Sequence, residues 1–100
     1  MAMMEISVVP LGTGSPSVSD YVAGAVRIVR DEPGVTWELT PMGTVVVGET
    51  ETLLSLAGRM HRSALAAGAV RVVTSLKIDE RTDKPLTIEG KKRAVNEKLG

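Results

Sequence analysis

Two short strand-like segments follow each other directly in the middle of this chain, between two stretches with helical periodicity. Residues 35–40 (VTWELT) alternate between apolar and polar side chains, and residues 44–48 (TVVVG) are rich in valine. The three residues between them, Pro41-Met42-Gly43, make a connection short enough for a β-hairpin. We therefore expect a fold built around an antiparallel strand pair that directly follows a helix.

A strand and a helix are expected before this hairpin. Residues 5–11 (EISVVPL) have the composition of a short strand and end at the turn Gly12-Thr13-Gly14. Apolar residues then recur at helical spacing, at Val18, Val22, Ala25 and Val29. We expect the helix to be capped by Ser15 or Ser17 and to end near Arg30.

A helix, a strand and a terminal helix are expected after the hairpin. The second helix should be capped by Thr50 or Thr52 and should end at Gly68. Its apolar stripe consists of Leu53, Leu56, Ala57, Met60 and Ala64. Residues 70–78 predict the fourth strand, and residues 87–99 predict a mostly polar helix. The apolar anchors of that last helix are Ile88 and Val95.

This order of elements predicts an α+β fold. Two crossovers around a central hairpin give a ferredoxin-like βαββαβ sandwich, with a four-stranded antiparallel sheet, two helices on one face and a C-terminal helix. An open sheet with another strand order is the alternative, and the hairpin after the first helix argues against it. The 100 residues suffice for one domain, spanning 1–100.

Composition and charge exclude several classes of function. Twelve basic residues balance twelve acidic ones, so no long-range field attracts nucleic acid or an anionic membrane. The chain has no cysteine and a single histidine, and it shows neither a nucleophile–base pair nor a metal cluster. No apolar run approaches the ~20 residues of a membrane span. We expect a cytoplasmic protein that is not an enzyme and needs no cofactor or metal.

Strand alternation separates an apolar sheet face from a mixed one. The apolar set is Ile6, Val8, Val35, Trp37, Leu39, Val70, Val72, Leu76 and Ile78. The mixed set is Glu5, Ser7, Val9, Thr36, Glu38, Thr40, Arg71, Val73, Ser75 and Lys77. In the third strand, either Val45 and Val47 or Thr44 and Val46 face inward. The mixed face suits water, a wet subunit interface or a polar small molecule.

Glu38 is a prominent residue of the mixed face because glutamate is disfavoured in strands. One interpretation is an ion pair with Lys77 or Arg71. The other is a carboxylate that accepts hydrogen bonds from a cationic or amino-bearing heterocycle. The residues themselves leave both open.

Three segments together resemble a known family. They are residues 8–13 (VVPLGT), 37–44 (WELTPMGT) and 76–81 (LKIDER). In this order they are similar to the small thiamine-binding proteins, which are related to the two-domain YkoF proteins. The resemblance implies a ferredoxin-like fold, dimers and tetramers, and non-catalytic binding of thiamine or its hydroxymethylpyrimidine moiety near the sheet surface and subunit interface.

The resemblance also implies a set of ligand-binding positions. They are Ser7, Glu38, Met42, Gly43 and Thr44. On this hypothesis Glu38 accepts hydrogen bonds from the aminopyrimidine, Ser7 and Thr44 add polar contacts, and Met42 forms an apolar wall. The competing hypothesis is an oligomeric structural or interaction module without a small-molecule ligand.

A homo-oligomer is expected on either hypothesis. Phe is absent, and Trp37 and Tyr21 are the only aromatic residues, so small aliphatic side chains must fill the core. Such a core buries less area per residue, and burial between subunits should supplement it. We expect a homotetramer built from dimers, with no nucleic-acid or membrane partner.

Overall fold

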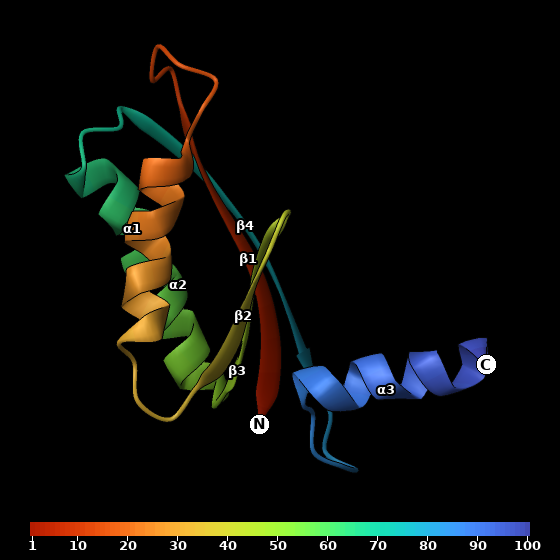
Figure 1. Cartoon of the computed structure of the whole chain (residues 1–100). Helices are drawn as coiled ribbons and strands as arrows, with labels where there is room; N and C mark the ends of the chain where they lie inside the picture. The colour runs from red at the N-terminus through yellow and green to blue at the C-terminus, as the bar shows by residue number, and fades with distance from the viewer.

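Four strands and three helices make up the protein (Figure 1). The computed structural model describes all residues from 1 to 100. The elements are β1 (Ala2–Leu11), α1 (Ser19–Arg30), β2 (Thr36–Thr40), β3 (Gly43–Gly48), α2 (Thr50–Ala66), β4 (Arg71–Glu80) and α3 (Ile88–Leu99). Their order confirms the predicted one.

The strands form one antiparallel sheet in the order β2-β3-β1-β4. α1 and α2 lie side by side on one face of this sheet, and α3 extends away from the opposite side (Figure 1). The predicted ferredoxin-like fold is confirmed. β1 begins at Ala2, three residues earlier than expected, because its first residues pair with both β3 and β4.

The core lies between the sheet and the helix pair. Its buried apolar residues are Ala2, Met4, Ile6, Val8, Ala25, Val29, Val46, Leu53, Leu56, Ala57, Met60, Ala64 and Ala69. Burial of each of the larger side chains contributes about 1.5–3 kcal/mol. The apolar stripe predicted for the second helix is fully buried, whereas the first two positions of the α1 stripe, Val18 and Val22, are only half-buried.

The sheet register decides which side of β3 faces the helices. Thr44 lies opposite Ile6, and Val46 lies opposite Met4, so both point toward the helices. Directly paired side chains share a face of the sheet. The prediction for Val70 is wrong, because this residue precedes β4 and is 93% exposed.

The predicted cap of α1 is wrong. The residue that precedes the first turn is Val18, which offers no side-chain hydrogen bond. The Ser15 hydroxyl instead accepts a hydrogen bond from the Ser17 backbone N–H at 3.1 Å, inside the preceding turn. That local bond places both serines outside the helix.

The predicted cap of α2 is also wrong, whereas its end is confirmed. Glu49 precedes the helix and makes no side-chain cap bond. The Thr50 hydroxyl is used elsewhere, because it donates to the Glu80 carboxylate at 2.7 Å. Gly68 follows the helix with φ of +108°, a backbone conformation that favours glycine at this position.

α3 has no buried residue. The Thr87 hydroxyl caps it by accepting a hydrogen bond from the Gly90 N–H at 2.9 Å. Val95 was expected to anchor the helix, but it is 59% exposed, and the buried residue near this helix is Leu86 in the loop before it. None of the three helices is both long and apolar enough to cross a membrane.

Candidate functional site

β1 is longer than the hairpin that pairs with it. It pairs with β4 along its whole length, but with β3 only from Ala2 to Ile6. From Ser7 onward, its second edge therefore has no neighbouring strand. We call this stretch, residues 7–11, the open edge of β1.

Val8 directs its backbone polar groups toward this open edge. A Cβ placed on Gly43 would lie 2.9 Å from the Ile6 carbonyl oxygen, so that oxygen faces β3. Backbone groups alternate in direction along a strand, and the N–H and C=O of Val8 therefore face the same side. Pro10 is two residues further along and therefore faces the same open edge. Proline has no backbone N–H, and at this edge no neighbouring strand needs one.

The residue that carries these two groups is buried. Val8 is only 7% exposed. The backbone hydrogen bonds that form outside the helices and strands include none to Val8. Buried backbone groups are almost always paired, so the edge beyond Ile6, where β3 supplies no partner for Val8, is a candidate place for another molecule to bind.

An apolar cavity of about 200 Å³ lies against the open edge, and we call it the edge cavity. It is lined by residues 6–9 of β1, residues 39–44 of the hairpin, Val18, Val22, Ala25 and Val26 beside or on α1, and Met60 of α2. Gly43 lets the hairpin approach the Ile6 carbonyl closely, since a side chain there would clash. The cavity thus follows from the mismatch in length between β1 and β3.

Three hydroxyl-bearing residues line the edge cavity, and their hydroxyl groups differ in availability. The Thr40 hydroxyl donates to the Gly43 carbonyl at 2.9 Å and accepts from the Met42 N–H at 3.2 Å, which fixes the hairpin turn. Thr44 is 3% exposed, yet its hydroxyl makes no hydrogen bond and is not sealed from solvent. Ser7 also lines the cavity, but it alternates with the inward-facing Ile6 and Val8 and lines a second pocket beside Glu5 and Lys77. Thr44 is thus the best-placed buried hydroxyl for a ligand.

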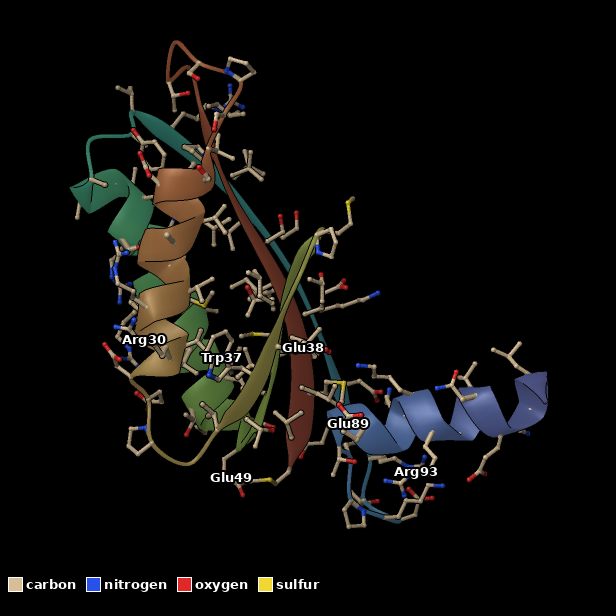
Figure 2. The ribbon with its side chains drawn as sticks, viewed as in Figure 1. Arg30, Trp37, Glu38, Glu49, Glu89 and Arg93 are labelled. Atoms are coloured by element: carbon tan, nitrogen blue, oxygen red, sulfur yellow. The ribbon has the colours of Figure 1, made fainter.

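The structure brings four of the five predicted site residues together. Ser7, Met42, Gly43 and Thr44 all line the edge cavity, whereas Glu38 does not. Figure 2 shows Glu38 on the side of β2 that faces α3. The Lys92 ammonium donates to the Glu38 carboxylate at 3.1 Å.

The ion pair of Glu38 therefore has a partner other than those predicted. Lys77 pairs instead with Glu5, at 3.6 Å. The hydrogen bond to Glu38 is the main cause that raises the pKa of Lys92, followed by the charges of Glu38 and Glu89. This pair connects α3 to the sheet, and both of its side chains remain substantially exposed.

The sequence analysis missed the backbone of Val8 and the contribution of α1 to the site. A signal was present in the unequal strand lengths, since the first strand was expected to span seven residues and the third strand five. Pro10 near the end of the first strand was a second signal, because proline occurs in strands mainly at unpaired edges.

Comparison with protein families gives a match over almost the whole chain. The model described as thiamine-binding protein matches residues 4–96. The chain belongs to the thiamine-binding protein family. The match includes every residue that lines the edge cavity.

Relatives of this family member occur in bacteria and archaea. The UPF0045 protein YqgV of Bacillus subtilis (strain 168) is 37% identical over 102 residues, covering 99% of this chain and 98% of that protein. A UPF0045 protein of Methanothermobacter thermautotrophicus is 39% identical over 100 residues, covering 99% of this chain and 100% of that protein.

Solved structures confirm the fold of this thiamine-binding protein family member. A hypothetical protein of Methanocaldococcus jannaschii superposes with a TM-score of 0.88 at 40% identity, over 96% of each chain. A Thermotoga maritima protein, proposed to act in thiamine biosynthesis or salvage, superposes with a TM-score of 0.77 at 26% identity. It covers 94% of this chain and 97% of its own.

Proposed function

We propose that this protein binds thiamine without turning it over, and that the aminopyrimidine ring occupies the edge cavity. The observation that carries the proposal is the position of Val8, a buried residue of β1 that has no partner residue on β3 and lines an apolar cavity together with Thr44. Membership of the thiamine-binding protein family supports the choice of ligand.

The hydrogen-bonding groups match those of an aminopyrimidine. Such a ring carries an amino donor next to a ring-nitrogen acceptor, and Val8 presents a carbonyl acceptor next to an N–H donor. The ring would extend the open edge of β1 as a short strand does. The Thr44 hydroxyl would serve a second ring nitrogen, and the apolar lining would enclose the ring faces.

Size and energetics support the same placement. An apolar cavity of roughly 150 Å³ holds a benzene ring, so about 200 Å³ accommodates a pyrimidine with small substituents. A buried polar group without a partner costs about 1–3 kcal/mol. A ligand that satisfies both groups of Val8 removes that cost when it binds.

Calorimetric titration with thiamine and with hydroxymethylpyrimidine tests the proposal. Saturable binding of both compounds to the full chain is the expected result, since both contain the aminopyrimidine. No heat from either compound, with folded protein shown by circular dichroism to be free of ligand, would contradict thiamine binding.

The Glu38→Gln variant distinguishes this site from the one based on Glu38. A carboxylate bonded to the pyrimidine contributes roughly 1.5–3 kcal/mol, so its loss should weaken binding about tenfold or more. The edge cavity does not include Glu38, and we therefore expect unchanged thiamine affinity by calorimetry. A tenfold loss in this variant would favour a site on the opposite sheet face.

We also propose that the protein is a homo-oligomer, with the tetramer as the expected state. α3 is a twelve-residue helix without a buried side chain, and isolated helices of this length are marginal in water. Val95 and Leu99 on it are 59% and 77% exposed, and Val9 and Val73 on the open sheet face are also exposed. Contacts between subunits would cover these side chains.

Light scattering of the double variant Val95→Asp, Leu99→Asp tests the role of α3 in assembly. The unchanged protein should have a mass near four times the 10.6 kDa of one chain, and the variant should be smaller but folded. The matched control is Glu97→Asp, which keeps the charge of the same helix. A monomeric unchanged protein at micromolar concentration would contradict the proposed assembly.

A further inference from the structure

The edge cavity opens into a longer groove between α1 and β2. This groove, which we call the α1 groove, has a volume of about 690 Å³ and a mostly apolar lining. Five residues line both spaces, namely Val18, Val22, Val26, Leu39 and Thr40. A ligand whose ring occupies the edge cavity can therefore extend into the groove along an apolar wall.

The groove exists because β2 is an edge strand that α1 covers incompletely. Trp37 and Leu39 lie on the helix side of β2, opposite Val46 and Thr44 of β3. They are nevertheless 36% and 56% exposed. Figure 2 shows Trp37 between β2 and the C-terminal half of α1. An exposed tryptophan face is thus available inside the groove.

Two arginines in the C-terminal half of α1, Arg27 and Arg30, line the groove. The Nε of Arg30 donates to the Asp31 carboxylate at 3.0 Å, and Figure 2 shows Arg30 in the last turn of α1. The pKa of Asp31 is lowered, chiefly by this hydrogen bond, and the charges of Arg30 and Arg27 act in the same direction. Arg27 takes part in no ion pair. Its guanidinium group remains free for an anion.

Sequence spacing relates these residues to the edge cavity. Trp37 lies two residues from the cavity residue Leu39 along the strand, which is about 7 Å. Arg27 directly follows Val26, which lines both the cavity and the groove, and its guanidinium group lies beside Gly24. An apolar cavity, an aromatic face and a free arginine therefore border one continuous space.

We infer that the α1 groove makes the protein a receptor for thiamine monophosphate, with the thiazolium ring against Trp37 and the phosphate on Arg27. This inference rests on the proposed thiamine binding and specifies the form of the ligand. A cationic ring is attracted to the face of tryptophan. A phosphate forms charge-assisted, two-point hydrogen bonds with a guanidinium group. Both residues line the space into which the edge cavity opens.

Calorimetry with thiamine, thiamine monophosphate and inorganic phosphate tests the inference. The unchanged protein should bind the ester about tenfold more tightly than thiamine, as expected for one charge-assisted hydrogen-bonding group. Arg27→Gln should erase this preference, so that the ester and thiamine bind with equal affinity. The matched control, Arg93→Gln on α3, removes the same charge far from the groove and should preserve the preference.

Trp37 provides a second readout, because it is the only tryptophan of the chain. Thiamine and its monophosphate should quench its fluorescence, whereas hydroxymethylpyrimidine, which fills only the cavity, should not.

Equal affinity for thiamine and its ester would overturn the phosphate site and leave the edge cavity supported. The phosphate site would also be overturned if inorganic phosphate alone bound tightly and still did so in the Arg27→Gln variant. A change in the mass of the oligomer in that variant would overturn it as well. Absence of any thiamine binding would instead contradict the proposed function itself.

Discussion

Replacing Val22 by Phe should abolish thiamine binding while the protein stays folded. Val22 is half-buried, and its side chain lines the edge cavity from α1. A phenyl ring requires roughly 150 Å³, which the cavity can supply without repacking the core. The ring would then occupy the place of the pyrimidine. We expect calorimetry to show affinity reduced on the order of 100-fold or more, equivalent to about 2.7 kcal/mol.

Leu54→Phe is the matched control, because Leu54 is 47% exposed on α2 and does not line the cavity. It should bind thiamine normally. Thr44→Val is a milder test that preserves volume and removes only the hydroxyl, and it should weaken binding about fivefold to tenfold. Normal thiamine affinity in a folded Val22→Phe protein would show that the ligand binds elsewhere.

The Leu56→Ala variant should lose a large part of the stability of the fold. Leu56 is completely buried in the core cluster beneath the sheet. Its truncation should lower the free energy of unfolding by about 3 kcal/mol, from the transfer of the lost atoms and the cavity left behind. The total free energy of unfolding of a domain of this size is roughly 5–15 kcal/mol. The melting temperature should fall by roughly 10–20 °C in differential scanning calorimetry.

The same substitution two residues earlier provides the comparison. Leu54→Ala makes the identical chemical change at a position that is 47% exposed on the same helix. It should alter the free energy of unfolding by less than about 0.5 kcal/mol. If the two variants lost similar stability, the packing of α2 against the sheet would differ from that described.

Periodicity predicted the positions of the elements because each signal is local. The hairpin around Pro41-Met42-Gly43 and the two apolar stripes each extend over only a few turns or residues. Helix caps were predicted less well. The Ser15 and Thr50 hydroxyls each had a competing partner, and for Thr50 this was Glu80, thirty residues further along the chain.

The residues that line the edge cavity were predicted only in part, because they come from segments that meet after folding. The family resemblance indicated Ser7, Met42, Gly43 and Thr44, which line one cavity. It did not reveal that Glu38 lies outside this cavity, where Lys92, fifty-four residues away, supplies its ion pair. A residue can be assigned to a strand face from alternation, but its partner across the fold cannot.

The amino-acid sequence by itself determined the order of the elements, the apolar faces that bury them and therefore the ferredoxin-like fold. These properties depend on side-chain spacing within a helix or strand. The tertiary structure decided that β1 extends beyond β3 and leaves Val8 without a partner residue there, that α1 lines the resulting cavity, and that Trp37 and Arg27 line the adjoining groove. Strand register and helix placement decide such features, because they depend on contacts between segments that are distant in the chain.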